Sequence, residues 1–278
     1  METEMLAPYT ARITYSIANT PHRQTFLLLS DIHWDNPLCD RVLLKKHLEQ
    51  AKTREAPIMV FGDLFCAMQG KYDPRSSKAA LRPEHQVPNY LDALVDTAVE
   101  FFKPYNVIFV SPGNHETAIL KRQETDLTKR FADGTGCKYG TYQGWVIFRA
   151  KRSGTVKTLN LAYHHGYGGG GPVTKDIIQA SRKAVYLPDA DIVVSGHTHD
   201  RWIFPIEREH ITARGKRVLA EQLHLKLGNY KDEFTPGVGW AVEKGHGPKS
   251  IGGVWLYLDY RHNDSGDHFA ASAELAAR

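Results

Sequence analysis

Five short polar clusters in this sequence contain side chains that bind divalent metal ions. The clusters are Asp31-Ile32-His33, Gly62-Asp63, Gly113-Asn114-His115, His164-His165 and His197-Thr198-His199. Their carboxylates, amide and imidazoles exceed what one tetrahedral ion needs, and they suit two ions that share a carboxylate. Two cations about 3.5 to 4 Å apart activate water and neutralise the charge that develops on a phosphoryl oxygen. The donor set therefore predicts a metal-dependent hydrolase that acts on phosphate esters.

The chemistry of these donors narrows the choice of metal. Imidazole and carboxylate without thiolate suit manganese, iron, zinc, nickel or cobalt better than calcium or magnesium. The three cysteines, Cys39, Cys66 and Cys137, have no paired spacing, which argues against a cysteine-bound zinc and for a reducing compartment. We expect two divalent ions, with manganese as the first choice.

Each polar cluster follows a short apolar run with the pattern of a buried β-strand. The runs are residues 26–29, 58–61, 107–110, 159–163 and 192–194. Such runs are typical of strands buried on both faces, and sites in open α/β sheets form at the carboxyl ends of strands. Because strand side chains alternate with a period of two, extended geometry would point Asp31 and His33 the same way, and His197 and His199 likewise. Each pair would then hold one ion.

Helical patterns alternate with these strands. The predicted helices cover residues 38–55, residues 91–102, the residues after His115 and the segment around Ile177 and Ile178. Residues 201–260 are mostly strand-like, and residues 254–258 are the last expected strand. This order predicts an α/β protein with layers packed around a central sheet.

The chain is expected to form one domain over residues 1–278, because no repeat or low-complexity linker divides it. Its 42% hydrophobic and 24% charged residues exclude a disordered or fibrous chain. The irregular stretch 64–88 is long for a connection, and loops of that length usually serve function, so we expect it to lie over the active site. It has an excess of two positive charges, from Lys71, Arg75, Lys78 and Arg82 against Asp73 and Glu84.

Taken together and in order, the motifs resemble the signature of the calcineurin-like metallophosphoesterases. They are Asp31-x-His33, Gly62-Asp63, Gly113-Asn114-His115-Glu116, a later histidine and Gly196-His197-Thr198-His199. The resemblance covers about residues 26–199. It implies a four-layer β-sandwich of two mixed sheets flanked by helices, with the site at the strand ends.

Carried over residue by residue, the resemblance implies two neighbouring metal sites bridged by Asp63. The first would use Asp31, His33 and His199, and the second Asn114, His197 and one histidine of the 164/165 pair. His115 would be the free histidine that protonates the leaving oxygen or stabilises the transition state. A hydroxide held between the ions would attack phosphorus, while the cations and Asn114 hold the phosphoryl oxygens. Singly, each motif is common turn or cap chemistry, and only their joint occurrence after five strands favours metal binding.

The spacing leaves open which histidine of the pair binds metal. His164 is the first residue after the apolar run, and for that reason it is our preferred ligand. His165 would then contact the metal ligands without binding metal itself.

A glycine-rich segment, residues 166–171, follows this pair. It satisfies the G-x-G-x-x-G pattern of dinucleotide-binding folds. Two histidines, however, separate it from the strand, and Lys175 comes too late for a phosphate-binding loop. We therefore expect no nucleotide cofactor. Instead, we expect the segment to form a loop that borders the metals and approaches substrate phosphate through its backbone N–H groups.

The net charge of +4 and the pI of 8.8 are compatible with a polyanionic substrate. Together with the basic loop, they favour a phosphodiesterase or nuclease that acts on nucleic acid or nucleotides. One alternative is a phosphomonoesterase acting on small molecules or proteins. An alternative of another class is a catalytically silent binding module stabilised by metal. No run approaches the roughly 18 apolar residues of a membrane span, so we expect a cytoplasmic protein without a membrane partner.

Overall fold

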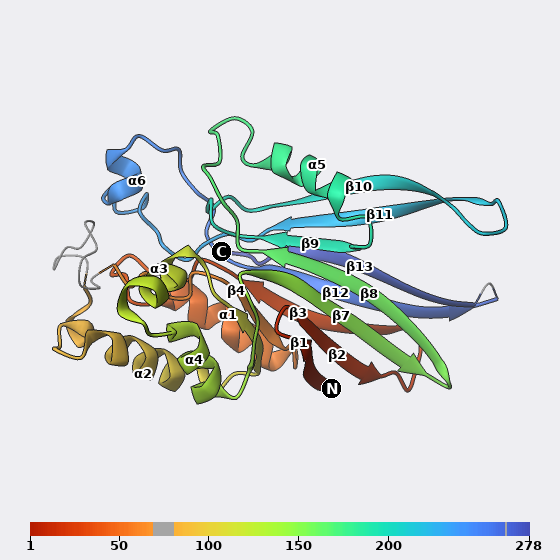
Figure 1. Ribbon diagram of the computed structural model, residues 1–278, viewed down its shortest axis with the longest axis horizontal. Helices are drawn as coiled ribbons and strands as arrows, with labels where there is room; N and C mark the ends of the chain where they lie inside the picture. Colours follow the sequence, from red (N-terminus) through yellow and green to blue (C-terminus); the bar gives the residue numbers. More distant parts are fainter. Residues whose placement is uncertain (69–80, 265) are drawn as a thin grey trace.

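The computed structural model describes residues 1–68, 81–264 and 266–278. In this part of the chain two β-sheets pack face to face, with helices on their outer faces (Figure 1). Each sheet contains both parallel and antiparallel neighbours. The predicted α/β sandwich of two mixed sheets is therefore confirmed.

The five strands that precede the polar clusters are divided between the two sheets. In spatial order, the seven-stranded sheet contains β1 (Glu2–Ala7), β2 (Thr10–Ser16), β7 (Gln143–Arg152), β8 (Thr155–His164), β9 (Ile192–Ser195), β11 (Arg217–Lys226) and β10 (Trp202–Ile211). The six-stranded sheet contains β13 (Gly266–Leu275), β12 (Val254–Asn263), β3 (His22–Leu29), β4 (Ile58–Phe61), β5 (Val107–Ser111) and β6 (Lys138–Tyr139). The clusters after β3, β4 and β5 thus come from one sheet, and those after β8 and β9 from the other.

Strand β3 shows why these strands are apolar throughout. Leu27 and Leu29 pack into the core beneath the helices, whereas Phe26 and Leu28 pack into the core between the sheets. Strand β4 divides its side chains in the same way. Two cores on opposite faces explain why alternation of polar and apolar residues is absent from the sequence here.

The helices are α1 (Arg41–Thr53), α2 (Tyr90–Phe102), α3 (Asn114–Gln123), α4 (Leu127–Thr135), α5 (Ile177–Tyr186) and α6 (Trp240–Glu243), with a short 3-10 helix over Pro83–His85. Helix α6 lies apart from both sheets (Figure 1). Helices α1, α2 and α4 pack on the six-stranded sheet, and α5 lies against the seven-stranded sheet (Figure 1). None of these helices in the described ranges is both long and apolar enough to cross a membrane.

The carboxy-terminal strand β13 was not expected. Its alanine-rich sequence has low intrinsic preference for strand, but it pairs antiparallel with β12 from Gly266 to Leu275. The expectation that residues 254–258 form the last strand is therefore wrong. Pairing with a neighbour, which the local sequence does not encode, imposes the strand conformation.

The expected loop over the site falls partly outside the described residues, because 69–80 are not described, and Lys71, Arg75 and Lys78 lie there. Two charged residues of its described part form contacts with other residues of the protein. Arg82 donates hydrogen bonds to the carbonyl oxygens of Asn36 and Cys39, and Glu84 pairs with Arg41 at 2.7 Å. These two charges therefore hold the loop end in place.

Candidate metal centre

The loops after five strands meet at one edge, where the two sheets adjoin. The backbone N–H of Asp31 donates to Gly62 O at 3.0 Å, which joins the loops after β3 and β4. In the other sheet the N–H of Gly196 donates to His165 O at 2.8 Å. The N–H of His197 then donates to Asp31 Oδ2 at 2.9 Å and connects the two sheets. These three hydrogen bonds position the polar clusters side by side.

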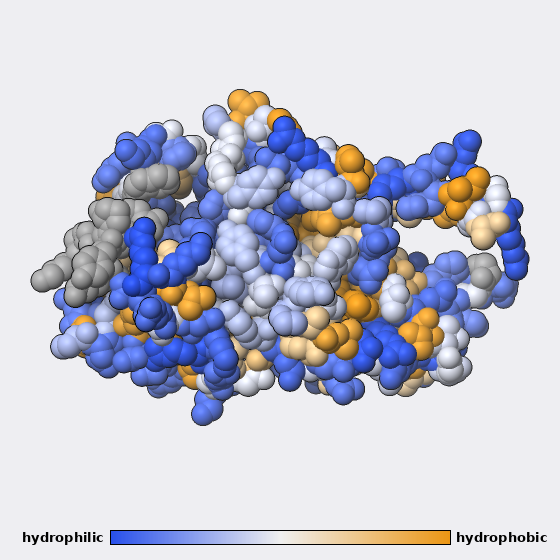
Figure 2. All heavy atoms as spheres, in the orientation of Figure 1, coloured by the Kyte–Doolittle hydropathy of each residue, from blue (hydrophilic) through white to orange (hydrophobic). Residues whose placement is uncertain are grey.

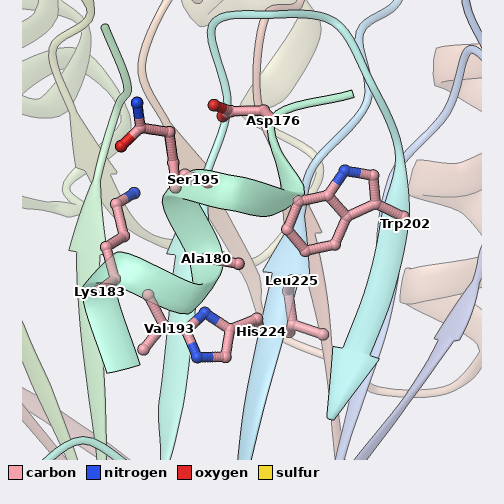
Figure 3. A pocket seen from close by; sticks show the side chains of 9 residues that line it. Asp176, Ala180, Lys183, Val193, Ser195, Trp202, His224 and Leu225 are labelled. Carbon is pink, nitrogen blue, oxygen red and sulfur yellow. The ribbon is translucent and has the colours of Figure 1, made fainter. Parts of the chain in front are cut away.

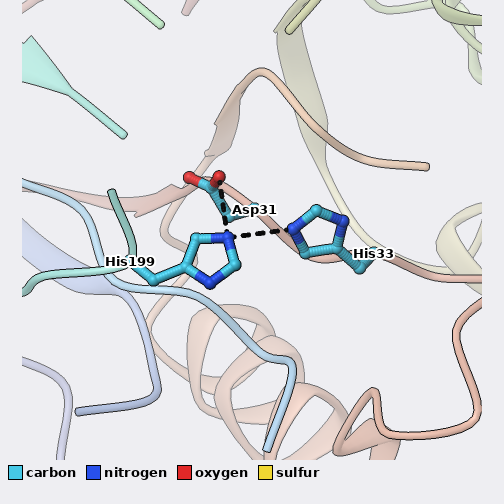
Figure 4. A group of neighbouring side chains, drawn as sticks. All are labelled: Asp31, His33 and His199. Carbon is cyan, nitrogen blue, oxygen red and sulfur yellow. Dashed lines mark hydrogen bonds and ion pairs between the residues drawn. The ribbon is translucent and has the colours of Figure 1, made fainter. Parts of the chain in front are cut away.

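The first group of donors consists of Asp31, His33 and His199 (Figure 4). One donor atom from each lies within 4.8 Å of the others. His199 Nε2 lies 3.1 Å from His33 Nε2 and 3.4 Å from Asp31 Oδ1. Two imidazole nitrogens and a carboxylate oxygen therefore converge on one point, as they would around a cation.

The hydrogen bonding of Asp31 tests whether a cation fits this group. Its Oδ2 accepts from Ser30 Oγ at 2.6 Å and from the N–H of His197. Its Oδ1 is buried and accepts no hydrogen bond from the described residues. A buried carboxylate oxygen without a donor is costly, and a bound cation would remove that cost. The group therefore fits a divalent metal ion.

The second group consists of Asp63, His165 and His197, with Asn114 between the two histidines. His165 Nε2 lies 3.1 Å from Asp63 Oδ2 and 3.2 Å from Asn114 Oδ1. His197 Nδ1 lies 2.8 Å from the same Asn114 oxygen. These residues offer a second set of oxygen and nitrogen donors next to the first.

The other ring nitrogens of this group are held by backbone carbonyls, which fixes the histidine tautomers. His165 Nδ1 lies 3.1 Å from Phe61 O, and His197 Nε2 lies 3.0 Å from Gly168 O. Since a carbonyl only accepts, each of these nitrogens carries the proton, and the opposite nitrogen faces the site. The contact at Gly168 also places the glycine-rich loop at the border of the centre.

The backbone at the donors is left-handed, which corrects the expectation of extended geometry. The φ angles are 49° at Asp31, 51° at His33, 49° at Asp63, 75° at His197 and 60° at His199. Asp31 and His33 still belong to one group, but His197 and His199 belong to different groups, so the expectation that His197 and His199 hold one ion as a pair is wrong. Left-handed backbone at non-glycine residues is strained, and it concentrates at functional sites.

Glycines make room for this packing. A Cβ at Gly62, whose φ is +87°, would collide with His165 Nδ1. A Cβ at Gly196 would collide with Ser30 Oγ and Asp31 Oδ2. The glycines of the Gly-Asp and Gly-His motifs are thus required by the close approach of the donors themselves.

The two carboxylates are held in the charged form. Burial alone would raise the pKa of Asp31, but His199, whose Nε2 lies 3.4 Å from Asp31 Oδ1, and the charge of His165 bring it below its ordinary value. Burial opposes ionisation of Asp63 as well, and the charges of His165 and His115 lower its pKa. Both acids therefore carry negative charge at neutral pH, as metal ligands must.

The histidines divide into charged and neutral forms. Burial would lower the pKa of His165, but the charges of Asp63 and Asp31 raise it to about 9. Burial lowers the pKa of His33 and of His197, and neighbouring histidine charges add to this effect. In the metal-free protein His165 is thus the cationic partner of Asp63, and its proton would leave when a metal ion binds.

His164, the preferred ligand from the sequence, lies outside both groups. Leu161 and Tyr163 of β8 face the core between the sheets, so His164 faces the outer side of the sheet. Its Nδ1 accepts from the N–H of Gly166 at 2.9 Å. The chain turns after the strand and brings His165 to Asp63 instead. The preference for His164 is therefore replaced by His165 in the ligand set that we propose.

His115 lies beside the second group. Its N–H donates to Asp63 Oδ1 at 3.0 Å, and its Nε2 lies 3.8 Å from Asp63 Oδ2. Its Nδ1 lies 2.6 Å from Cys66 O and therefore carries a proton. The Nε2 atom is left facing the site.

Two buried acids that the sequence analysis gave no role support the loops. Glu116 accepts the N–H groups of Asp63, Phe65 and Gly113 at 3.2, 2.8 and 2.7 Å, and burial together with the charge of Asp63 raises its pKa to about 8. Asp35 accepts the N–H groups of Cys66 and Ala67 at 2.6 and 2.9 Å. Most of the N–H groups that donate to them are distant in sequence, so only the position of Glu116 directly after His115 gave a signal.

Comparison with known proteins places this geometry in a family. Among solved structures, the chain is similar to Vacuolar Protein Sorting 29 from Cryptosporidium parvum, with 16% identity over 91% of this chain and 99% of that one and a TM-score of 0.40. It is also similar to GAP50, the anchor in the inner membrane complex of Plasmodium, with 12% identity over 92% and 84% of the chains and a TM-score of 0.39. No curated protein sequence matches the chain. The family model of the calcineurin-like phosphoesterases matches residues 24–201, more than half of the sequence. The chain therefore belongs to the calcineurin-like phosphoesterase family.

Proposed function

We propose that this protein is a metal-dependent phosphodiesterase or nuclease that works with two divalent cations, manganese being the first choice. One observation carries the proposal. Two groups of largely buried donors, connected by the hydrogen bond from the N–H of His197 to Asp31 Oδ2, meet at one edge of a fold whose family hydrolyses phosphoesters. Asp31, His33 and His199 would hold one cation, and the other would be held by Asn114, His165 and His197.

Asp63 is proposed to bridge the two cations. Its Oδ2 lies 3.1 Å from His165 Nε2, and its charge also acts on His33 of the first group. A carboxylate has two oxygens and could therefore bind two ions, one through each oxygen. Two divalent cations, when bound, lower the pKa of water and stabilise negative charge on phosphoryl oxygens.

His115 is proposed to deliver the proton to the leaving oxygen. Because Nδ1–H is engaged with Cys66 O, Nε2 is the atom that gains or loses a proton. Asp63 Oδ2 lies 3.8 Å from this nitrogen. A proton held at this atom would pass to the ester oxygen as the bond to phosphorus breaks.

The preference for diesters rests on charge. The chain carries a net charge of +4 and has a pI of 8.8. A positive protein attracts nucleic acid and nucleotides, and the affinity of a nuclease for nucleic acid would fall as salt is raised.

The test is hydrolysis of two chromogenic substrates after loading with manganese, bis(p-nitrophenyl) phosphate and p-nitrophenyl phosphate. We expect a higher kcat/KM for the diester, and Asp63→Asn as the control should lose it. A preference for the monoester would replace the diesterase by a phosphomonoesterase. If manganese binds but neither substrate is hydrolysed, the protein is a metal-stabilised binding module and not an enzyme.

A further inference from the structure

A cavity of about 330 Å³ lies between α5 and the outer face of the seven-stranded sheet. We call it the aromatic cavity. Its lining includes Tyr9, Trp145, Tyr167, Tyr186, His164 and Lys183. Tyr9, Tyr167 and Tyr186 are 58%, 51% and 57% exposed, so their rings border open space rather than a packed core. Figure 2 shows pale and orange surface gathered around α5 on a face that is otherwise largely hydrophilic.

The aromatic cavity adjoins the metal centre through two consecutive residues. His164 lines the cavity, and His165 belongs to the second group of donors. The ring of Tyr142 contacts both, with ring centroids 5.3 Å from that of His164 and 5.5 Å from that of His165. The aromatic cavity and the second group of donors therefore border each other at Tyr142.

Lys183 supplies a cation to this cavity. Its side chain is on the sheet side of α5, where it also lines a second cavity of only about 10 Å³ (Figure 3). The residue is 6% exposed and, within the described ranges, has no hydrogen-bond or ion-pair partner. The nearby Lys226 is different, because it pairs with Asp176 at 2.6 Å. Burial and the charge of Lys226 lower the pKa of Lys183 to about 8, and an acceptor in the cavity would stabilise its charged form.

We propose that the aromatic cavity binds the base of a nucleotide whose phosphate lies at the metal centre. Bases stack on aromatic side chains with little dependence on sequence, and their ring nitrogens and carbonyl oxygens accept hydrogen bonds from a lysine such as Lys183. A volume of about 330 Å³ is at the small end of known ligand sites, which suits one base better than a large ligand. The inference rests on the proposed phosphoesterase function and names its substrate class.

Binding is tested first by calorimetry on the metal-free 278-residue chain, in which no turnover occurs. Adenosine 5′-monophosphate and ribose 5-phosphate are the probes, because they differ only in the base. We expect the first to bind about tenfold more tightly or better, since stacking on one aromatic residue contributes about that much. Equal affinity for the two probes would overturn the proposal.

Tyr186→Ala tests the cavity wall, and Val185→Ala is its matched control. Both residues are exposed on α5, but only Tyr186 lines the cavity. Tyr186→Ala should remove most of the preference for the base, and Val185→Ala should keep it. Lys183→Met, which preserves side-chain length, should weaken binding of the same probe. If Tyr186→Ala and Lys183→Met both bind like Val185→Ala, the base does not occupy this cavity.

Turnover separates this inference from the proposed function. The manganese-loaded enzyme is given thymidine 5′-(p-nitrophenyl phosphate) and methyl p-nitrophenyl phosphate. A higher kcat/KM for the nucleoside ester, lost in Tyr186→Ala, supports both proposals. Equal rates for the two esters overturn the base site alone, and base-dependent binding without any hydrolysis overturns the phosphodiesterase alone.

A third comparison identifies the source of the base. A single-stranded oligonucleotide that binds more tightly than the mononucleotide, with strong salt dependence, indicates nucleic acid. If the oligonucleotide and the mononucleotide bind with equal affinity, the ligand is a free nucleotide. Both results support the base site.

Discussion

The two donor groups lie side by side but differ in how far the protein itself satisfies them. In the second group, Asp63 accepts the N–H of His115 and faces His165, and backbone carbonyls hold His165 and His197. In the first group, Asp31 Oδ1 and His33 Nδ1 are buried without a hydrogen bond from the described residues. The second group is thus held by the protein's own hydrogen bonds, whereas the first leaves Asp31 Oδ1 open to a cation.

Replacing the shared carboxylate should have the largest effect on both groups. Asp63→Asn keeps the shape of the side chain but removes the charge that both cations would use. We expect kcat/KM for the diester to fall by more than about 100-fold, because even residues that only support metal ligands cost about 10- to 100-fold. Hydrolysis and circular dichroism are measured together, since the variant should remain folded. Full activity would rule out a bridging role.

The histidine pair tests the second group alone. His165→Asn should lower manganese affinity by about 100-fold and reduce the stoichiometry of tight binding from two to one, as measured by calorimetry. His164→Asn is the matched control and should bind two ions, because its side chain faces the outer side of the sheet. The reverse result would return the ligand role to His164.

His115 should affect turnover without affecting metal binding. His115→Ala removes the proton at Nε2 and should lower kcat by about 100-fold, the lower range for general acid catalysis. Metal content by calorimetry should stay at two ions. A loss of one ion in this variant would make His115 a ligand rather than a proton donor.

The contrast between the two histidines also shows what sequence could predict. The strands and the order of the clusters were visible, because strands buried on both faces, such as β3, are continuously apolar and end at a polar residue. The choice of His165 was not visible, because it depends on how the chain turns after β8 and on which side chain that turn brings to Asp63. The aromatic cavity was invisible for another reason. Tyr9 lies between β1 and β2, Trp145 in β7 and Tyr186 at the end of α5, so no local spacing connects them.

The smallest expected effect is a change of stability with pH in the metal-free protein. The pKa of His165 is raised from about 6.5 in the unfolded chain to about 9 in the folded one, so its stabilisation is complete below pH 6.5 and is lost as pH rises through 9. The free energy of unfolding should therefore fall by about 3 kcal/mol at most over this window. Glu116, with its pKa raised to about 8, acts in the same direction.

Thermal unfolding in a chelator at pH 6.5 and pH 9 measures this change, and His165→Asn isolates the histidine because Glu116 is retained. The variant should lose less stability over the window than the unaltered protein does. Loading with manganese should also weaken the pH dependence, since a metal-bound His165 has already given up the proton at Nε2. An identical loss of stability in the variant and the unaltered protein would mean that the Asp63–His165 pair is not the charged pair of the metal-free second group.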